Sequence, residues 1–487
     1  MSETTSDTTK IKTPNLMDAL IPLIAMVVML TTAVMYFGDG SSSGPNQIAL
    51  LFAAGVAIII GLKNGHQWAG IEKAIIKGIS ISLGAVLILL AVGSLIGTWL
   101  LSGTVPTLIY YGLEILNPQW FYVATCAICG LVAMSIGSSW TTAATIGVAL
   151  LAVSNGLGLD SAITAGAIIS GAYFGDKISP LSETTNLAPA VAGTELFKHI
   201  RYMLWTTLPS ITTALVLFMI LGFSAEVKQN TDGTLQLNQL MQEHFNISVF
   251  NLIPLVILLV LAIKKMPAFL AVSIGAISGA VWAVLFQQDF IMSLAGSGVD
   301  AVTANIKVVW TAFFDGVSVS TGNENLDSLL SRGGMSGMLN TVWLIICALT
   351  FGAVLEHLGL LRKLMDSILK GVNSVGGLIT STVGTCIATN IVTADQYMAI
   401  VMPGRMYKEE YERRELDPVV LSRTLEDAGT ITSPLIPWNT CGAYMYGVLA
   451  VNPLDYVFYC FFNLINPVLA VIYAYMGFKI KKLVKAV

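Results

Sequence analysis

The twelve residues 175–186, GDKISPLSETTN, combine several side chains that can bind or carry a small cation. Two carboxylates, Asp176 and Glu183, stand beside Lys177 and among serine, threonine and asparagine side chains. Their oxygen atoms are hard donors, which suit small hard cations. Pro180 lies between the two carboxylates, and a proline removes a backbone donor and clashes with the preceding helical turn. The segment therefore predicts a cation site at an interrupted helix.

The sequence on both sides of this segment is apolar, and so is most of the chain. The 487 residues are 55% hydrophobic and 11% charged, with a mean hydropathy of +0.76. A soluble domain carries about 25% charged residues. Apolar runs long enough to cross a hydrocarbon core of about 30 Å recur from residue 19 to residue 478. The composition excludes an ordinary soluble enzyme and predicts a polytopic α-helical membrane protein.

A repeated motif indicates that the chain has two related halves. Gly-x-x-x-Ser-Pro-Leu occurs at 175–181 and again at 429–435, 254 residues later. Upstream, LIGTWLLSGTVPTLIYYGLEILN aligns with FGAVLEHLGLLRKLMDSILKGVN at nearly the same offset, and SIGSSWTTAAT (135–145) corresponds to TNIVTADQYMA (389–399). The motif and its flanking hydropathy pattern together favour an internal repeat.

The charged residues of corresponding loops predict the orientation of this repeat. Lys and Arg favour cytoplasmic loops. Loop 63–77 carries three lysines, whereas its counterpart 288–333 is net acidic; turn 156–160 has no basic residue, whereas its counterpart 404–424 has five, including Arg423. Corresponding loops are therefore expected on opposite sides of the membrane. Such inverted repeats are common in secondary transporters.

We expect an all-α polytopic membrane protein with two inverted-topology repeats. The expected units are a cytoplasmic tail (1–16), the first repeat (17–224), an extracytoplasmic linker (225–248), the second repeat (249–478) and a basic cytoplasmic tail (479–487). In each repeat one long segment with a polar centre, 119–155 or 375–409, predicts a re-entrant helical hairpin. Segments 160–191 and 421–450 predict broken transmembrane helices, because irregular backbone in a bilayer has to be buried in protein or line a cavity.

Two long motifs, FGDKISPLSETTNLAPA and EDAGTITSPLIPWNTCGA, resemble the signature regions of the NhaC family of sodium/proton antiporters. The resemblance covers roughly residues 15–480. It implies two inverted units, each with a re-entrant hairpin and an interrupted helix, and exchange of Na⁺, and also Li⁺, for H⁺. Some relatives exchange malate for lactate together with Na⁺ and H⁺, so an organic-acid exchanger is the alternative. Glu183 stands where the family often has Asp, and the longer side chain could alter ion preference.

Asp176 is the main candidate for a carboxylate shared by Na⁺ and H⁺, because a lone ionised carboxylate in the bilayer is costly and either ion neutralises it. We expect Na⁺ near Asp176, Ser179 and Glu183, with Lys177 as a charge-pairing residue. Glu426 and Asp427 are candidates for a gate or for further site carboxylates. The other candidate ligands belong to the hairpins and breaks: Thr184, Thr185, Asn186, Ser138, Ser139, Thr141, Asn390, Thr393, Asp395, Thr430, Thr432, Ser433, Asn439 and Thr440.

Structural roles are the alternative for these residues. Asp176 could pair with neighbouring Lys177, Glu183 could cap a helix near Ser182, and the hydroxyls could satisfy the backbone freed by each break. Among other functions, an intramembrane aspartyl protease is disfavoured because Tyr173 stands where that class has Gly. A channel is disfavoured because two inverted halves suit alternating access.

The alternative exchanger would need a cationic anchor for its organic acid, and Lys177 is the one lysine plainly placed within a span. The expected partners are the lipid bilayer, Na⁺, Li⁺ and H⁺ and, for the alternative function, a small dicarboxylate or lactate. We expect no cofactor and no nucleic acid. A homodimer is expected in a bacterial cytoplasmic (inner) membrane, with both termini in the cytoplasm.

Overall fold

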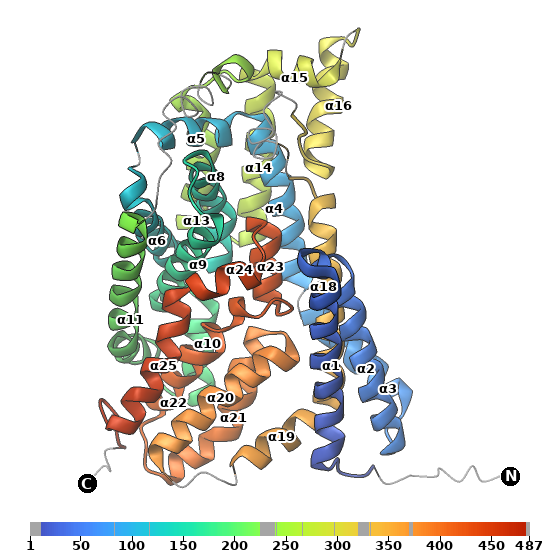
Figure 1. Cartoon of the computed structure of the whole chain (residues 1–487), viewed down its shortest axis with the longest axis vertical. Helices are drawn as coiled ribbons and strands as arrows, with labels where there is room; N and C mark the ends of the chain where they lie inside the picture. The colour runs from blue at the N-terminus through green and yellow to red at the C-terminus, as the bar shows by residue number, and fades with distance from the viewer. Residues whose placement is uncertain are drawn as a thin grey trace, which may run out of the picture.

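The computed structural model consists of α-helices joined mostly by short turns (Figure 1). It describes residues 11–81, 83–115, 117–224, 239, 241–264, 266–296, 298–319, 331, 333–369 and 374–483. Several predicted segments lie partly outside these residues: the N-terminal tail (1–10), the linker (225–238 and 240), the acidic loop (320–330) and the C-terminal tail (484–487).

In the first half of the chain the predicted hairpin and broken-helix segments are helical, and α3 (Trp68–Ile81) also covers most of the predicted loop 63–77. The helices are α1 (Leu16–Phe37), α2 (Pro45–Lys63), α3, α4 (Leu83–Leu101), α5 (Thr104–Ile115), α6 (Pro118–Ile136), α7 (Ser139–Thr142), α8 (Val148–Gly156), α9 (Ser161–Ile178), α10 (Glu183–Ala192) and α11 (Leu196–Ser224). A π-helical turn, Ala143–Gly147, joins α7 to α8.

The second half contains a comparable series of helices. They are α13 (Ile253–Ile263), α14 (Ala268–Phe286), α15 (Gln288–Ala295), α16 (Ala301–Phe314), α18 (Leu339–His357), α19 (Leu360–Leu369), α20 (Val375–Thr393), α21 (Gln396–Arg413), α22 (Pro418–Leu425), α23 (Thr440–Leu449), α24 (Pro453–Tyr456) and α25 (Phe461–Met476). A π-helical turn, η5 (Glu426–Thr430), extends α22, and a 3₁₀ turn, η6 (Ser433–Leu435), follows it.

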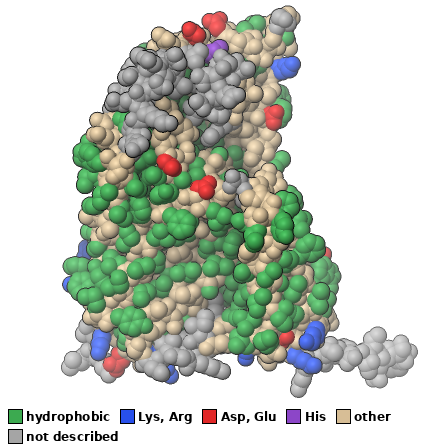
Figure 2. All heavy atoms as spheres, in the orientation of Figure 1, with side chains coloured by type: hydrophobic (Ala, Val, Ile, Leu, Met, Phe, Trp, Pro, Cys, Tyr) green, Lys and Arg blue, Asp and Glu red, His purple; other side chains and the backbone are tan. Residues whose placement is uncertain are grey.

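Seven helices in the described part of the chain are long and apolar enough to cross a membrane, or up to nine if each of two bent pairs forms one span. Hydrophobic side chains cover much of the lateral surface (Figure 2). Such a surface is disfavoured in water and suits lipid. The predicted all-α polytopic membrane protein is confirmed.

Both segments predicted as re-entrant hairpins contain two helices joined by a tight turn, and the two turns are built in the same way; their re-entry into the membrane stays a prediction. In the first, Gly137 ends α6 in the left-handed conformation (φ 76°), and the Ser138 side chain caps α7 by accepting from the Thr141 N–H at 3.1 Å. In the second, Ala394 ends α20 with φ 55°, and the Asp395 side chain caps α21. A left-handed residue ends a helix and a capping side chain starts the next, which explains why each turn is so tight.

The two predicted broken helices are also present. Ser179 ends α9, and the Ser182 side chain caps α10 by accepting from the Thr185 N–H. In the second half, the helical backbone is interrupted between Thr430 and the start of α23, which Asn439 caps. Each break therefore lies where the sequence places proline next to hydrogen-bonding side chains.

The two broken helices run in opposite directions. Lys198, which follows α10, forms an ion pair of 3.0 Å with Asp417 at the start of α22. At the other end, Asp160 at the start of α9 and Asn452 after α23 line one surface pocket. The start of each broken helix thus lies beside the end of the other, as inverted halves require. An inverted-repeat relation between the complete halves stays a prediction.

Loops rich in Lys and Arg lie at the same end of the molecule as both ends of the described chain. The Lys12 N–H donates to the Asn64 carbonyl (2.9 Å), and the Leu483 N–H donates to the Glu415 carbonyl (2.8 Å). In Figure 1, α1 begins and α25 ends at the lower end, whereas α15 lies at the upper end. Most of the Lys and Arg visible in Figure 2 lie at that lower end.

The acidic segment 288–333 differs from the simple solvated loop predicted for it. Its described part contains α15 and α16, and α16 packs against α4. Asp300 caps α16 by accepting from the Val302 and Thr303 N–H groups. The helix contains an apolar run ending in VVWTAFF. The loop was predicted from the net charge of the segment, and the net charge does not reveal this helix.

Glycines allow α6 and α9 to touch backbone to backbone. A Cβ atom added to Gly171 or to Gly175 would lie 2.1 Å from the carbonyl oxygen of Cys126 or Gly130, respectively. Real Cβ atoms do not approach a carbonyl oxygen so closely, so only glycine fits at these two positions. The residue before Asp176 is therefore pressed against the first hairpin.

Candidate functional site

The two hairpin tips and the two helix breaks meet around a cavity of about 650 Å³. Its wall also includes residues of α4 and of the turn before α14. The polar side chains that line it are Ser138, Ser139, Thr141, Asp176, Ser182, Glu183, Thr184, Asp395, Gln396, Tyr397 and Thr440. Eight of these were predicted as site residues. Three of the described lining residues are carboxylates, namely Asp176, Glu183 and Asp395, and none is Lys, Arg or His.

Asp176 lies at the centre of this arrangement, where the tip of the first hairpin holds it. Its Oδ2 accepts hydrogen bonds from the Ser139 N–H (3.1 Å) and from the Ser139 hydroxyl (2.7 Å). Its Oδ1 is buried and has no hydrogen-bond partner among the described residues. The side chain is 8% exposed. An ionised carboxylate accepts several hydrogen bonds, so Oδ1 retains capacity for a ligand.

Glu183 is close to Asp176 in the sequence but is not enclosed beside it in the structure. It is the first residue of α10 and is exposed. The Tyr397 hydroxyl of α21 donates to its Oε2 at 2.5 Å. Glu183 therefore connects the two halves across the cavity rather than lying enclosed beside Asp176.

Three other predicted ligands of the first break satisfy the backbone in this conformation. The Ser179 hydroxyl accepts from the Leu181 N–H (3.3 Å). The Thr185 hydroxyl donates to the Lys177 carbonyl (3.0 Å), and the Asn186 amide donates to the Pro180 carbonyl (2.9 Å). These bonds use groups that the break frees. A role of these residues as ion ligands stays a prediction.

In the second half only Asp395 and Thr440 of the predicted ligands line the cavity. Asp395 is 4% exposed and accepts from the Met398 N–H at 2.9 Å. The other residues predicted there, Asn390, Thr393, Thr430, Thr432, Ser433 and Asn439, are buried but do not line it. Asn390, for example, donates to the Gly429 carbonyl (2.6 Å) and thereby holds the π-helical turn η5.

Lys177 pairs with Asp427 and not with the carboxylate of its neighbour Asp176. Both partners are fully buried, and the pair joins α9 of the first half to η5 of the second. The Thr206 hydroxyl and the Asn466 amide each donate to the same Asp427 oxygen at 3.0 Å. The charge-pairing role predicted for Lys177 is thus directed at the other half of the chain.

Arg423 is also fully buried, which corrects its assignment to a basic cytoplasmic loop. Its Nε lies 3.7 Å from Asp427 Oδ2, and its guanidinium group lies 4.5 Å from the centre of the Tyr202 ring. The sequence groups it with the basic run that begins at Arg405. The structure ends that run at Arg414, because Asp417 caps α22 and carries Arg423 into the interior.

Glu426 lies behind the cavity wall and is fully buried. The hydroxyl of Thr184, which does line the cavity, donates to Glu426 Oε1 at 3.1 Å. Glu426 Oε2 is buried without a hydrogen-bond partner of normal length in the described part of the chain. The residue is therefore linked to the cavity through one side chain.

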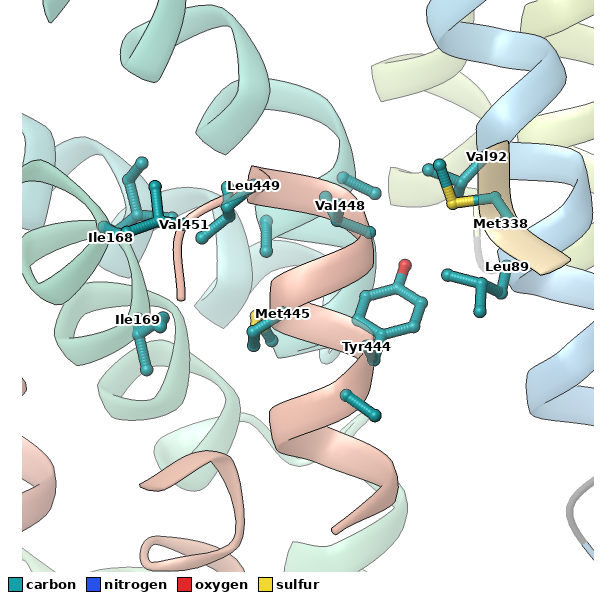
Figure 3. Close-up of a cluster of buried hydrophobic side chains, with 14 of the residues drawn as sticks. Leu89, Val92, Ile168, Ile169, Met338, Tyr444, Met445, Val448, Leu449 and Val451 are labelled. Atoms are coloured by element: carbon teal, nitrogen blue, oxygen red, sulfur yellow. The ribbon is translucent and has the colours of Figure 1, made fainter. Parts of the chain in front are cut away.

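Trp140 lines the cavity and belongs to an aromatic stack behind it. Trp140 of the first hairpin stacks on Tyr444 of α23, with ring centroids 4.1 Å apart. Figure 3 shows Tyr444 pointing from α23 towards Leu89 and Val92 of α4 and towards Met338. The stack joins the hairpin of one half to the broken helix of the other.

Sequence reasoning missed several residues of this site. Trp140, Ser182, Gln396 and Tyr397 line the cavity, and each lies within two residues of a predicted residue. Trp140, Gln396 and Tyr397 follow the tips of the hairpins. The helix that follows each hairpin tip turns successive residues towards different faces. Extending each predicted tip by a turn would have included all three.

Comparisons with known proteins agree with this architecture. The model of the Na⁺/H⁺ antiporter family matches residues 171–478. The Na⁺/H⁺ antiporter NhaC of Alkalihalophilus pseudofirmus is 37% identical over 89% of this chain and 91% of its own length. The malate-2H⁺/Na⁺-lactate antiporter of Bacillus subtilis is 37% identical over 96% of each chain.

A third relative has another kind of named substrate. The arginine/ornithine antiporter ArcD of Halobacterium salinarum is 36% identical over 96% of this chain and 93% of its own length. The family indicated by the two sequence motifs is thereby confirmed. The chain belongs to the Na⁺/H⁺ antiporter family, whose members matched here are transporters and not enzymes.

Proposed function

We propose that this protein exchanges Na⁺, and also Li⁺, for H⁺ by alternating access, with Asp176 as the carboxylate that binds either ion. The observation that carries the proposal is the cavity between the hairpin tips and the breaks. Its described lining contains three carboxylates and several hydroxyls but no cationic side chain. Carboxylate and hydroxyl oxygens suit a small hard cation, and this lining favours cations over anions.

Asp176 supports the exchange through its environment. Oδ2 is fixed by Ser139, whereas Oδ1 faces no donor of the described residues. Within the hydrophobic thickness of a membrane, an ionised carboxylate with an unsatisfied oxygen is costly. Na⁺ or H⁺ relieves that cost in turn, and the two ions exclude each other at a single oxygen.

An organic-acid exchanger is the second candidate, because about 650 Å³ is far more room than a single Na⁺ occupies. The names of two relatives include organic substrates, malate and lactate in one and arginine and ornithine in the other. An organic carboxylate would need a cationic anchor. Lys177 and Arg423 both face Asp427 and do not line the cavity. The cavity thus supports the simple cation exchanger better.

The membrane orientation forms part of the same proposal. The basic loops and both ends of the described chain share one end of the molecule. The positive-inside rule places such an end in the cytoplasm. We propose a bacterial cytoplasmic membrane and a homodimer for this chain.

Purified protein in liposomes tests the proposal. In vesicles with a preformed pH gradient and no organic acid, added Na⁺ or Li⁺ should dissipate the gradient, as followed by a pH-sensitive dye. K⁺ at the same concentration is the control. Exchange that requires malate and lactate, or arginine and ornithine, would contradict simple Na⁺/H⁺ exchange and support the corresponding organic substrate.

A further inference from the structure

The buried charges around the cavity are unbalanced. Six Asp, Glu, Lys or Arg side chains near the breaks are at most 8% exposed: Asp176, Lys177, Asp395, Arg423, Glu426 and Asp427. Four are carboxylates and two are cations, so the group lacks two positive charges when all six are ionised. A buried charge without compensation is costly. One cation at Asp176 removes only half of the imbalance.

Asp427 does not supply the second binding position, because its charge is already compensated. Lys177 contacts it directly, Arg423 lies 3.7 Å away, and two further side chains donate hydrogen bonds to it. Asp395 is also partly compensated, since it caps α21 and lies at the positive end of that helix dipole. Glu426 forms no ion pair with a described residue and caps no helix, and only the charge of nearby Lys177 compensates it in part, so it is the remaining candidate.

Glu426 has one hydrogen bond of normal geometry and one oxygen without such a bond. The bond comes from the Thr184 hydroxyl, at 3.1 Å. Its second oxygen is buried and makes no hydrogen bond of normal geometry to a described residue, while the Thr430 hydroxyl lies near enough to act on the carboxyl group. An ionised carboxylate offers about four acceptor positions, whereas a protonated one needs fewer partners. This environment suits a carboxyl group that binds a proton.

A proton can reach Glu426 from the cavity, whereas a metal ion cannot. Thr184 lines the cavity, whereas Glu426 does not. A hydrated Na⁺ cannot pass a threonine side chain, but a hydroxyl group can relay a proton. A hydronium ion in the cavity gives its proton to the Thr184 oxygen as that hydroxyl releases its own proton to Glu426 Oε1, and a water molecule is left in the cavity. One O–H bond breaks and one forms at each step, and the cavity loses one proton.

We propose that Glu426 is a second proton-binding site, loaded from the cavity through Thr184 and closed to Na⁺, so that the exchange carries two protons for each Na⁺. This inference rests on the proposed Na⁺/H⁺ exchange. The charges of Asp176 and Lys177 of α9 act on Glu426, and Asp427 and Arg423 are its neighbours along its own helix, where they pair with each other. His199 of α11 shares a hydrogen bond with Ser422, and the charge of Lys177 acts on its ring.

The number of protons is measured from the gradients at which net flux stops. In liposomes held at zero membrane potential with K⁺ and valinomycin, a Na⁺ gradient of about tenfold is balanced by about half a pH unit if two protons exchange, and by about one unit if one exchanges. We expect half a unit for the unmodified protein and one unit for Glu426→Gln. Glu426→Asp, which keeps a carboxyl group, should retain half a unit.

Two outcomes would overturn the inference while leaving Na⁺/H⁺ exchange intact: balance at one unit in the unmodified protein, or balance at half a unit in Glu426→Gln. If Na⁺ moved no protons in the unmodified protein, the proposed function itself would be wrong. Thr184→Val removes the relay and should slow exchange at least about tenfold. Thr184→Ser keeps the hydroxyl and should restore the rate.

A spectroscopic measurement covers the case in which Glu426→Gln fails to fold. Infrared difference spectra of the Asp176→Asn protein should still show a protonated carboxyl band that titrates with pH. Glu426→Asp in the same background should shift the frequency of that band. A band that Glu426→Asp leaves unchanged belongs to another residue, and this result would also overturn the inference.

Discussion

The two broken helices carry similar motifs but place their carboxylates in different surroundings. In the first break, Asp176 lines the cavity, and its buried Oδ1 has no hydrogen-bond partner among the described residues. In the second, Glu426 and Asp427 are fully enclosed, and Thr440 is the predicted residue that reaches the cavity. The first break therefore offers a binding position to ions, whereas the carboxylates of the second break are buried behind the cavity wall.

The position of each carboxylate relative to the shared glycine explains this difference. Asp176 directly follows Gly175 and stands just before the end of α9. Glu426 and Asp427 precede Gly429 and form the start of the π-helical turn η5. They therefore lie further from the break, inside the packed helix. The two copies of this sequence motif thus have two distinct chemical roles.

The sharpest way to break the comparison is to remove the carboxylate that reaches the cavity. Asp176→Asn keeps the shape but loses the exchangeable proton and the negative charge, so coupled Na⁺/H⁺ exchange should be abolished in folded protein. Glu183→Gln, at the exposed position, should cause a smaller loss. Near-normal Na⁺-driven proton flux in Asp176→Asn liposomes would shift the main site to Asp395.

The enclosed charges predict a large effect on stability. Lys177→Met leaves the buried Asp427 carboxylate without its direct cation, which should cost about 3–5 kcal/mol of unfolding free energy. Lys198→Met is the matched control, because Lys198 is 41% exposed in its pair with Asp417 and such pairs contribute about 0–1 kcal/mol. Chemical denaturation in detergent measures both. Equal losses in the two variants would contradict the distinction between enclosed and exposed pairs.

Competition between Na⁺ and H⁺ tests the role of the first break, and we expect an effect of intermediate size. Protons and Na⁺ compete for Asp176, so lowering the external pH should raise the apparent KM for Na⁺, by up to about tenfold per pH unit for each competing proton. The maximal rate at saturating Na⁺ should change much less. A maximal rate that falls while KM stays constant would show that the proton acts elsewhere.

The bond across the cavity should have the smallest effect. Tyr397→Phe removes the hydrogen bond from the Tyr397 hydroxyl to Glu183, and one such bond contributes about 0.5–1.5 kcal/mol. We therefore expect a change of about two- to tenfold in the apparent KM for Na⁺, measured by dye-based exchange. Tyr407→Phe, which removes a buried hydroxyl bonded to Thr385 away from the cavity, is the control and should leave KM unchanged.

Much of the backbone plan could be predicted from the sequence. Prolines beside polar side chains mark both breaks, and polar side chains within apolar segments mark both hairpins, because irregular backbone in lipid has to be buried in protein or line a cavity. Asp176 could also be identified, since a carboxylate in such a segment requires a purpose. The inverted orientation was predicted from the loops, and the opposite directions of the two broken helices agree with it.

The long-range pairings could not be predicted in the same way. Lys177 and Asp427 are 250 residues apart, and nothing local in the sequence selects one partner over another. Arg423 looks like the end of a basic loop until Asp417 is seen to start a helix before it. The segment 301–314 was hidden by the acidic residues around it. Each of these features depends on packing between elements that are distant in the chain.

The contact between α6 and α9 has a mechanical consequence. Two glycines bring these backbones together so closely that a single methyl group would not fit between them. The helix that carries Asp176 therefore cannot slide along the first hairpin, and the two must travel as one rigid part. Alternating exposure of the ion then depends on displacement of other parts of the cavity lining, which include α4 and the turn before α14.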